Sequence, residues 1–335
     1  MKIGVVGAGS WGTALAYLLS KNGHNITLWG YNKEEIENLN KDRENKRFLP
    51  DVKFQDSLKV TSIDDDMQDN EIIILAVPSK AVREICERFK NIFNDGRIIV
   101  NVAKGLEENT LLRLSEVIKE VIPNSNVAVL SGPSHAEEVG KNMATACVVS
   151  AYDIDVAKKV QDIFMNITFR VYINMDIIGV ELGGALKNLI ALAAGASDGC
   201  GFGDNTKSAL ITRGIAEIAR LGMAMGAKRE TFSGLTGIGD LIVTCTSVHS
   251  RNRQAGILLG QGKSLKETLE EVKMVVEGIN TAKAAYNLSL KYNVDMPITR
   301  EINVVLYNNK NTKDAVITLM TRNKTDEQEE KNLII

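Results

Sequence analysis

The first dozen residues, Met1–Gly12, constrain the fold of this chain more than any other stretch. Ile3, Val5 and Val6 form an apolar run too short for a helix and therefore predict a buried strand. A G-x-G-x-x-G turn follows, and helical periodicity begins at Thr13; the glycines are Gly7, Gly9 and Gly12. In such a turn the glycines allow a sharp bend, approach of a pyrophosphate and close helix–strand packing. Glycine-rich turns also serve structural roles, but the flanking strand and helix favour dinucleotide binding at the helix start.

Length, charge and cysteine usage narrow the class of protein. A chain of 335 residues exceeds one typical core, which predicts two domains. The net charge of -2 argues against a nucleic-acid-binding or polybasic membrane surface. The four cysteines show no C-x-x-C spacing, and no apolar run reaches the ~20 residues of a membrane span. We therefore expect a cytoplasmic protein with no nucleic-acid partner, no membrane span and no bound metal.

Strand and helix patterns alternate through the first half of the chain. After the first strand, strands are expected at residues 25–30, 58–61, 71–78, 97–102, 126–130, 146–150 and 168–172. Helices are expected between them at residues 81–92, 110–121 and 155–165. This alternation predicts a Rossmann-type, doubly wound, mostly parallel sheet. Beyond it the periodicity is helical, so we predict a dinucleotide-binding domain over residues 1–178 and an all-α substrate and catalytic domain over residues 179–335.

Loops that leave the carboxyl ends of parallel strands are where ligands bind in such a sheet. Lys104 directly follows an expected strand, which places its ammonium group near the cofactor, although an exposed loop lysine is an alternative. Gly132 and Ser134 follow the next strand, in a turn able to present backbone N–H groups. His135 beside them is a candidate acid–base group, and a histidine that bonds the backbone is an equal alternative.

Lys187 is the strongest single candidate for a catalytic residue in the chain. It is the only charged side chain between Glu181 and Asp198, and glycine and alanine dominate one face of the predicted helix around it. Small residues around a lone lysine indicate a crevice where a backbone or a ligand approaches closely. Burial lowers the pKa of a lysine from about 10.4 towards roughly 7–8, the range useful for general acid–base catalysis. A structural pairing with Glu181 or an aspartate is the alternative.

Three further features are candidates for ligand binding. Asp240 is flanked by glycine with little charge nearby, which suits a carboxylate that orients a lysine or binds a hydroxyl. Ser250, Arg251 and Asn252 open a predicted helix and offer a hydroxyl, a guanidinium, an amide and backbone N–H groups to a phosphate. A capped helix with surface arginines is the alternative. The Glu277 carboxylate could reach a ribose or an arginine, or could cap a helix.

The end of the second expected strand leaves the choice of nicotinamide cofactor open. An acid at this place commonly binds the ribose hydroxyls of NAD, and an arginine accommodates the 2′-phosphate of NADP. This chain instead has Tyr31, Asn32 and Lys33. No carboxylate is present to repel a 2′-phosphate, and Lys33 could attract one, but the three residues include no arginine to clamp it.

Together these motifs resemble those of bacterial NAD(P)-dependent glycerol-3-phosphate dehydrogenases almost from end to end. The most specific part combines Gly-Ala-Leu-Lys-Asn at 184–188, Gly-Asp-Leu at 239–241 and Ser-Arg-Asn at 250–252. The glycine-rich turn and the stretch 131–140 match as well. The resemblance implies a homodimer with a Rossmann domain and an all-helical domain. It also implies reversible NAD(P)H-dependent reduction of dihydroxyacetone phosphate to sn-glycerol 3-phosphate, which supplies phospholipid biosynthesis.

The resemblance also implies roles for individual residues. Lys187 is implied as the proton donor and acceptor, with Lys104 and Asp240 polarising and orienting the substrate. Substrate contacts are implied for Lys104, Gly132, Ser134, Lys187, Asp240, Ser250, Arg251 and Asn252. Cofactor contacts are implied for Gly7, Gly9, Ser10, Trp11, Gly12, Tyr31, Asn32, Lys104, Ala136, Arg251, Val275 and Glu277. Family members often carry an arginine where this chain has Tyr31, so either NADH or NADPH is expected as cofactor.

Two other functions stay open from the residues. Another dehydrogenase with a Rossmann domain and a helical domain, acting on a hydroxyacid or a sugar acid, also uses a helical lysine or a histidine. Such an enzyme does not need the Ser-Arg-Asn group at 250–252 as a phosphate site. A regulator that binds NAD(P) without turnover has no reason to keep a lone lysine in an apolar helix.

Overall fold

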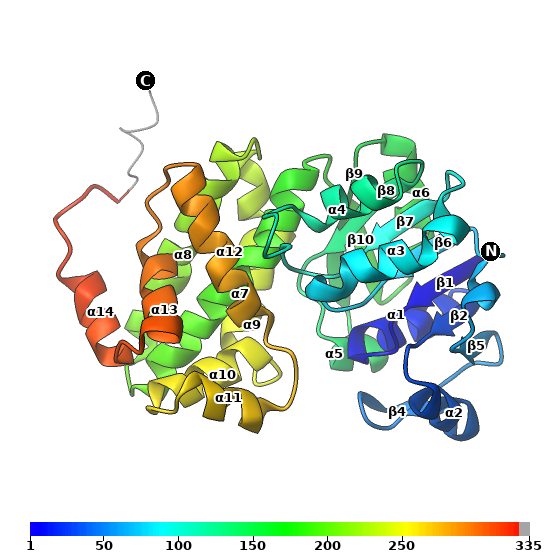
Figure 1. The fold of residues 1–335 in the computed structure, drawn as a ribbon, viewed down its shortest axis with the longest axis horizontal. Helices are drawn as coiled ribbons and strands as arrows, with labels where there is room; N and C mark the ends of the chain where they lie inside the picture. The colour runs from blue at the N-terminus through cyan, green and yellow to red at the C-terminus, as the bar shows by residue number, and fades with distance from the viewer. Residues whose placement is uncertain (328–335) are drawn as a thin grey trace.

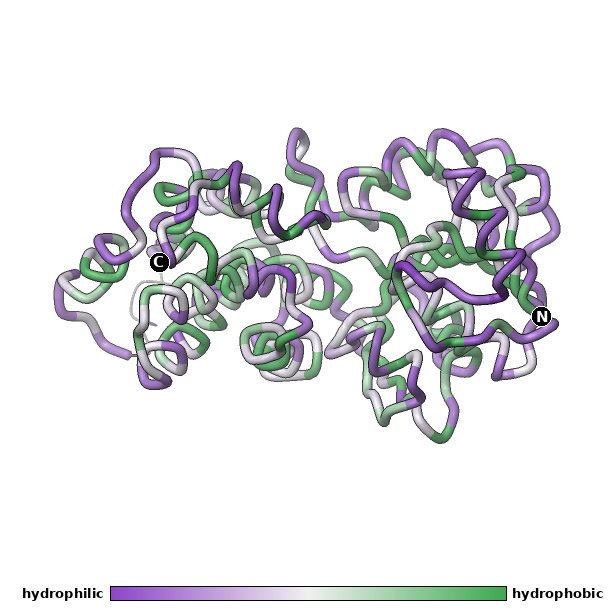
Figure 2. The backbone as a smooth tube through the Cα atoms, turned by 90° about the horizontal axis from the view of Figure 1, so that it is seen from below, coloured by the Kyte–Doolittle hydropathy of each residue, from purple (hydrophilic) through white to green (hydrophobic). Residues whose placement is uncertain are grey.

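The computed structural model describes residues 1–327, and the last part of the predicted second domain, residues 328–335, lies outside the described residues. A sheet covered by helices forms one half of the molecule, and a bundle of helices forms the other (Figure 1). The N-terminus lies at the outer end of the sheet half. Coloured by hydropathy, the backbone has hydrophobic segments inside both halves and hydrophilic loops around them (Figure 2).

The large sheet has eight strands in the order β10-β9-β8-β7-β6-β1-β2-β5. β1 lies between β2 and β6, with Val5 paired to Leu28 on one side and Ile74 on the other. All neighbouring strands are parallel except β8 and β9, which run antiparallel, so the prediction of a mostly parallel sheet is confirmed. The strands are β1 Lys2–Val6, β2 Asn25–Trp29, β5 Leu58–Thr61, β6 Ile72–Leu75, β7 Ile98–Asn101, β8 Asn126–Ser131, β9 Thr145–Ala151 and β10 Phe169–Ile173.

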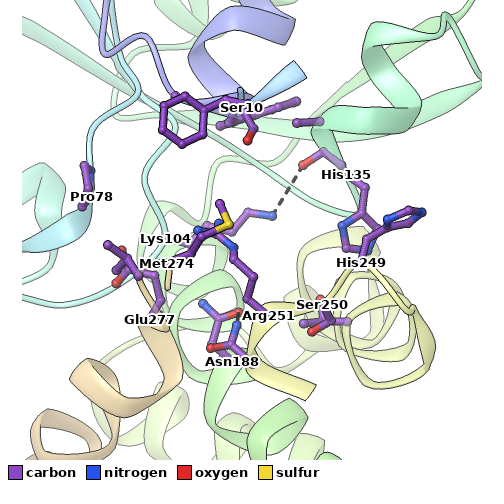
Figure 3. Close-up of a pocket in the computed structure, with 18 of the residues that line it drawn as sticks. Ser10, Pro78, Lys104, His135, Asn188, His249, Ser250, Arg251, Met274 and Glu277 are labelled. Atoms are coloured by element: carbon purple, nitrogen blue, oxygen red, sulfur yellow. Dashed lines mark hydrogen bonds between the residues drawn. The ribbon is translucent and has the colours of Figure 1, made fainter. Parts of the chain in front are cut away.

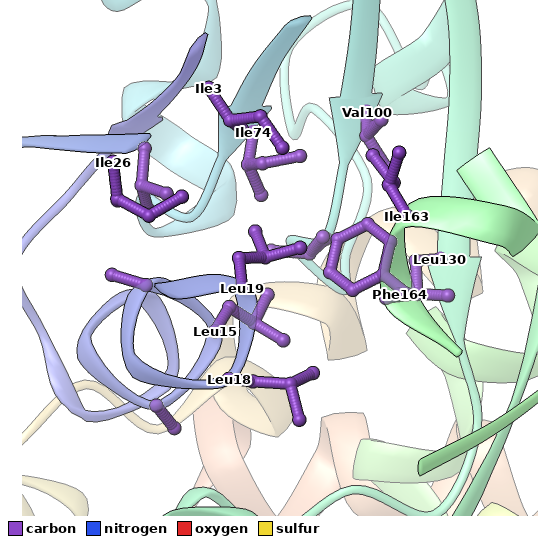
Figure 4. Packing of buried hydrophobic residues seen from close by; sticks show 14 of the residues in the cluster. Ile3, Leu15, Leu18, Leu19, Ile26, Ile74, Val100, Leu130, Ile163 and Phe164 are labelled. Atoms are coloured by element: carbon purple, nitrogen blue, oxygen red, sulfur yellow. The ribbon is translucent and has the colours of Figure 1, made fainter. Parts of the chain in front are cut away.

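Helices bury both faces of this sheet, which explains why its central strands are continuous apolar runs. Ile72 and Ile74 belong to the core that the first and sixth helices cover, where Leu15, Leu19 and Phe164 pack (Figure 4). The alternate positions of the same strand, Ile73 and Leu75, belong to the core under the third and fourth helices. The helices of this half are α1 Ser10–Lys21, α2 Lys33–Asp42, α3 Val82–Phe93, α4 Leu114–Val121, α5 Ala136–Gly140 and α6 Ile154–Phe164, with short 3₁₀ turns at Asp64–Met67 and Ser79–Ala81.

Two details differ from the predicted elements. The helix expected at residues 110–121 begins only at Leu114, because Leu106 pairs with Arg113 in an isolated bridge and Leu111 has a left-handed φ of 63°. A left-handed residue interrupts helical geometry, so the chain turns back before α4 begins. Sequence periodicity also missed a small antiparallel pair, β3 Glu44–Asn45 and β4 Leu49–Lys53, because strands this short carry no repeat.

A long central helix, α7 Ile177–Gly199, organises the other half and is buried along most of its length. The remaining helices pack around it, and together they form a second hydrophobic core (Figure 1). This all-helical region confirms the predicted fold class. Its other elements are α8 Asp204–Ala224, a 3₁₀ turn at Arg229–Ser233, a π-helical turn at Leu235–Gly239, α9 Asp240–Thr246, α10 Arg251–Gly260, α11 Leu265–Val272, α12 Glu277–Lys291, α13 Pro297–Asn308 and α14 Thr312–Met320.

The small residues of α7 let another helix reach its backbone. A Cβ atom on Gly195 would lie 2.1 Å from the backbone oxygen of Arg253 in α10. On the other helix, a Cβ atom on Gly256 would lie 2.1 Å from the backbone oxygen of Leu192. No side chain fits at either place, so the glycines set the distance between α7 and α10. This contact fixes the start of α10 beside the middle of α7.

By length and mean hydropathy alone, α7 could cross a membrane. Among the described residues, α7 is the one helix of which this is true. However, 94% of its most apolar stretch is buried inside the protein. Its apolar surface is therefore covered by the chain's own helices, which is the environment of a core helix.

Candidate functional site

The glycine-rich turn forms a cradle at the carboxyl end of β1. Gly7 has a φ of 115°, which few other residues adopt, and a Cβ atom on Gly12 would lie 1.8 Å from the backbone oxygen of Gly7. Gly9 caps α1, and a Cβ atom there would meet nothing within 4 Å. The first turn of α1 contains no acidic residue. The turn is therefore bent, closely packed behind and open in front, which fits a pyrophosphate.

A cleft of about 880 Å³ extends from this turn to the helical half. Figure 3 shows Lys104, Arg251 and Glu277 around a common space, with Ser10 across from them. Most of the sequence-predicted residues line this cleft: Gly9, Ser10, Trp11, Lys104, Ser134, Ala136, Lys187, Ser250, Arg251, Asn252, Val275 and Glu277. The other predicted residues are not part of the cleft lining. Gly7 and Gly12 form the closely packed back of the glycine-rich turn, and Gly132 and Asp240 are hydrogen-bonded to Lys104, which does line the cleft. Tyr31 and Asn32 also lie outside the lining.

Two lysines and one carboxylate meet beside the cleft. Lys104, just after β7, donates from Nζ to Asp240 Oδ2 at 2.7 Å and to the backbone oxygen of Gly132 at 2.9 Å. Lys187, in the middle of α7, donates to Asp240 Oδ1 and to Thr244 Oγ1, the latter at 2.7 Å. The side chain of Asp240, the first residue of α9, is only 1% exposed. One buried carboxylate therefore joins a cation from each half of the molecule.

Burial sets the protonation of this group. Burial lowers the pKa of the Lys187 ammonium to about 7, although the neighbouring Asp240 carboxylate opposes the change. Burial alone would raise the pKa of Asp240, but the ammonium groups of Lys104 and Lys187 outweigh it and hold that pKa below its usual range. Lys187 can therefore gain and lose a proton near neutral pH while Asp240 stays ionised.

Gly184 explains how Lys104 comes so close to α7. A Cβ atom on Gly184 would lie 2.6 Å from Ser131 Oγ and 3.6 Å from Lys104 Cγ. The glycine thus leaves room for the aliphatic part of the lysine that pairs with Asp240. The crevice expected around Lys187 from its small neighbours is occupied by a second lysine.

The start of α10 presents one free cation to the cleft. Ser250 caps the helix, its Oγ accepting from the backbone nitrogen of Arg253 at 3.2 Å. Asn252 donates to Asn188 Oδ1 at 3.0 Å and accepts from the backbone nitrogen of Gly278 at 2.7 Å, which ties α10 to α7 and α12. Within residues 1–327, the side chain of Arg251 makes no ion pair or hydrogen bond, and the residue lines the cleft. The geometry leaves its guanidinium for a ligand.

Glu277 joins the two halves at the mouth of the cleft. Its carboxylate accepts from the backbone nitrogen of Ser79 at 3.2 Å and from Ser79 Oγ at 2.6 Å. Ser79 follows β6, whereas Glu277 begins α12. Its carboxylate is therefore bonded to the start of a short 3₁₀ helix of the other half and lies within the cleft lining.

Glu181 and Lys187, considered as possible partners, bind different groups. The Glu181 carboxylate accepts from Arg113 Nη1 at 2.6 Å and from the backbone nitrogen of Ser115 at 2.8 Å. Lys187 is paired with Asp240, so the buried pairing with an aspartate is the one present. The ion pair between Glu181 and Arg113 fixes α7 against the start of α4.

Sequence reasoning missed Thr244 and left His135 undecided. Thr244 follows Asp240 by one helical turn, and that spacing was the signal that α9 would bring both side chains to Lys187. His135 Nε2 is buried and has no hydrogen-bond partner in the described part of the chain, so this nitrogen does not bond the backbone. Burial lowers the pKa of His135, and the cations of Lys187 and Lys104 act in the same direction. Its ring lies 6.0 Å from that of His249.

The cysteines are not placed for chemistry. All four carry free thiols, and burial raises the pKa values of Cys86, Cys147 and Cys245 to about 12. Among residues 1–327, no three histidine, cysteine, aspartate or glutamate side chains are grouped as a metal site requires.

Comparison with known proteins gives a consistent result over the whole chain. The family model for the N-terminus of NAD-dependent glycerol-3-phosphate dehydrogenase matches residues 2–157, and the model for the C-terminus matches residues 176–317. A glycerol-3-phosphate dehydrogenase [NAD(P)+] of Fusobacterium nucleatum is 57% identical over 97% of this chain and 98% of its own length. The Bacillus subtilis protein of the same name is 53% identical over 98% of this chain and 96% of its own length.

A solved structure agrees with these sequence relatives. The crystal structure of glycerol-3-phosphate dehydrogenase from Coxiella burnetii superposes with a TM-score of 0.93 and 36% sequence identity. The superposition covers 96% of this chain and 99% of that one. The fold of both halves of the molecule, and the way the halves are arranged, therefore match that structure.

Proposed function

The chain belongs to the NAD-dependent glycerol-3-phosphate dehydrogenase family, and from this premise we propose which residues hold the cofactor, hold the substrate and move the proton. The protein is an NAD(P)-dependent oxidoreductase that interconverts dihydroxyacetone phosphate and sn-glycerol 3-phosphate. The observation that carries the residue assignment is the Asp240 carboxylate, buried between the ammonium groups of Lys104 and Lys187.

The glycine-rich turn holds the pyrophosphate of the cofactor. The open face at Gly9 and the free N–H groups of the first turn of α1 support this assignment. When bound, the nicotinamide carries the hydride, which no side chain can supply. The residues assigned to the cofactor are Gly7, Gly9, Ser10, Trp11, Gly12, Tyr31, Asn32, Lys104, Ala136, Arg251, Val275 and Glu277.

The start of α10 holds the phosphate of the substrate. Arg251 contributes a guanidinium with no partner among the described residues, which suits paired hydrogen bonds to phosphate oxygens. Asn252 and Ser250 are fixed in place by the bonds that cap α10 and tie it to α7. Gly132 and Ser134, both near Lys104 Nζ, line the other side of the substrate.

Lys187 moves the proton. Its ammonium has three N–H donors, and Asp240 and Thr244 accept from it, which leaves one donor for the substrate oxygen. In reduction, Nζ gives a proton to the oxygen of the former carbonyl group as the hydride adds to carbon, and the neutral amine then regains a proton from water. The Lys104 ammonium stabilises the developing negative charge, while Asp240 orients both lysines. Oxidation of glycerol 3-phosphate reverses these steps.

The proposal extends to the organisation and role of the protein. The beginning of α7 at Ile177 and the family models that end at residue 157 and begin at residue 176 support domains of residues 1–178 and 179–335. We assign the enzyme to the cytoplasm as a homodimer that supplies glycerol 3-phosphate for phospholipid biosynthesis. Sedimentation of the purified protein tests the dimer, which a monomer mass at micromolar concentration would exclude.

The substitution Lys187→Met tests the proton transfer. Methionine keeps the length of the side chain but cannot hold a proton, so we expect kcat for dihydroxyacetone phosphate reduction to fall by about 10²- to 10⁴-fold. Binding of NADH or NADPH, followed by nicotinamide fluorescence, should change little. Lys159→Met, an exposed lysine of α6, is the matched control and should keep full activity. Activity of the Lys187 variant within tenfold of wild type would remove this lysine from the proton-transfer role.

A further inference from the structure

The end of β2 lies directly against the glycine-rich turn. The backbone nitrogen of Gly7 donates to the backbone oxygen of Trp29 at 2.8 Å. Gly30 packs closely there, because a Cβ atom on it would lie 2.5 Å from Cδ1 of Ile36 and 3.2 Å from the Cβ of Ala8 in the turn. Tyr31 is therefore the first side chain free to project beyond this strand, beside the turn. In dinucleotide-binding sheets the adenosine ribose lies at this place.

The residues adjacent in sequence do not supply a phosphate clamp. Asn32 Oδ1 accepts from the backbone nitrogens of Glu34 and Glu35 at 3.0 and 3.2 Å, so its side chain caps α2. Tyr31 is 72% exposed and carries no charge. Lys33 is exposed in the first turn of α2 and is followed by two glutamates. An anion bound here needs a cation from elsewhere in the fold.

Arg88 of α3 supplies that cation. Its guanidinium carbon lies 5.4 Å from the ring centroid of Tyr31 and 5.0 Å from that of Trp29. Asp64 accepts from Arg88 Nε at 2.8 Å and from Nη2 at 3.0 Å, and also from Trp29 Nε1 at 3.0 Å. Two rings and one carboxylate thus hold the guanidinium in one orientation at the end of β2. Among residues 1–327, Nη1 of Arg88 has no partner.

An ion pair made only for stability is the competing explanation. Exposed pairs contribute little stability, and the two side chains here are 37% and 33% exposed. A guanidinium that is stacked and oriented in advance is suited to bind phosphate, since little side-chain freedom is lost on binding. A 2′-phosphate also carries more negative charge than the single carboxylate of Asp64, so it competes for the same cation.

We propose that Arg88 is the specificity-determining residue of this enzyme, and that its guanidinium, stacked on Tyr31, binds the 2′-phosphate of NADP(H). This inference rests on the proposed function in one respect, that the dinucleotide occupies the glycine-rich turn. The arginine that is missing after β2 is replaced in space by one from α3.

The substitution Arg88→Met tests this assignment in the full-length protein. Methionine still covers the two rings but loses the charge. Calorimetric titration measures the affinity of each protein for 2′,5′-ADP, which carries the ribose phosphate, and for 5′-ADP, which does not. We expect the variant to bind 2′,5′-ADP about 10- to 100-fold more weakly, as for a lost hydrogen bond between charged groups, with 5′-ADP unchanged. The kcat/KM for NADPH should fall equally, with that for NADH unchanged.

Two control variants sharpen the result. Lys90→Met removes an exposed cation of the same helix, which is paired with Glu87 at 2.8 Å, and should change neither affinity. Asp64→Asn keeps one oxygen that can accept from Arg88 and so help to orient it, but removes the competing negative charge, and should tighten binding of 2′,5′-ADP.

Three results would overturn the inference, and they differ in what else they contradict. Equal weakening of both nucleotides by Arg88→Met, or weakening of neither, would exclude Arg88 while leaving the proposed function intact. Binding of neither nucleotide by the wild-type protein would contradict the proposed cofactor site itself, and the inference would fail with it.

Discussion

Replacing Asp240 with asparagine changes the charge balance of the site with little change in shape. The carboxylate lies 2.7 Å from Lys104 Nζ, is bonded to Lys187 Nζ, and is almost fully buried. Asparagine keeps the size and one accepting oxygen but removes the negative charge. That charge is what opposes the effect of burial on the pKa of Lys187.

The size of the effect follows from the distance between the charges. Two unit charges about 4 Å apart interact by ~4 kcal/mol at an effective dielectric constant of about 20. One pKa unit corresponds to about 1.36 kcal/mol. Without the carboxylate, the pKa of the Lys187 ammonium therefore falls by about three from its value of about 7. Lys104 stays beside it as a cation and acts in the same direction.

The pH dependence of kcat/KM for dihydroxyacetone phosphate measures this change, because it reports the pKa of the free enzyme. With Lys187 as the proposed proton donor, reduction needs this lysine protonated, so the rate is high below the pKa and falls tenfold per pH unit above it. The fall begins near pH 7 in the wild-type protein. In Asp240→Asn it should begin about three pH units lower.

A matched variant separates charge from hydrogen bonding. Thr244→Val removes the neutral hydroxyl that accepts from Lys187 Nζ at 2.7 Å and leaves the carboxylate in place. A neutral hydrogen bond contributes about 1 kcal/mol, so the fall should move by less than one pH unit. An Asp240→Asn enzyme with the pH dependence of the wild type would refute the reasoning, since Lys187 would then not be the titrating acid.

Three further substitutions test packing and buried charge. Arg113→Met leaves the Glu181 carboxylate buried without a counter-ion, so the free energy of urea unfolding should fall by about 3–5 kcal/mol near neutral pH; a loss below about 1 kcal/mol would contradict this. Gly195→Ala forces a methyl group against the backbone of α10 and should raise the KM for dihydroxyacetone phosphate, whereas Gly203→Ala, with nothing within 4 Å of its Cβ atom, should not. Burial raises the pKa of Glu217 from 4.5 to about 7, so the folded protein binds this proton more tightly than the unfolded chain. Stability should therefore decline by about 3 kcal/mol as pH rises from about 4.5 to about 7, and Glu217→Gln should abolish that decline; an unchanged decline in the variant would contradict the assignment.

The fold could be predicted from the sequence where a repeat marks it. Strands such as β6 are short apolar runs because both faces are covered, and α7 is apolar all round because helices surround it. The late start of α4 could not be predicted, because a bridge between Leu106 and Arg113 and a left-handed residue decide it. Tertiary contacts leave no periodic signal in the residues that make them.

In the candidate site, too, local sequence patterns predict some features, and tertiary contacts decide the others. The small neighbours of Lys187 predict its burial, since only glycine and alanine leave space for a lysine inside a helical core. Whether its partner is Glu181 or an aspartate depends on a contact across 53 residues of chain, which the local pattern does not contain. Likewise, the residues that follow β2 in the sequence offer only Lys33 as a cation, whereas the cation that stacks on Tyr31 is Arg88, which comes from α3.

The Asp240 carboxylate makes the pKa of the proposed proton donor, Lys187, depend on how the two halves of the molecule meet. Asp240 and Lys187 both belong to the helical half, whereas Lys104 comes from the sheet half. If the halves separated, Lys104 would leave Asp240 and water would reach Lys187, and both changes raise the pKa of its ammonium. The lowered value of about 7 therefore belongs to this arrangement of the two halves, in which Arg251 and the glycine-rich turn also face one cleft. The same contact that assembles the cleft thus also makes Lys187, the proposed proton donor, a stronger acid.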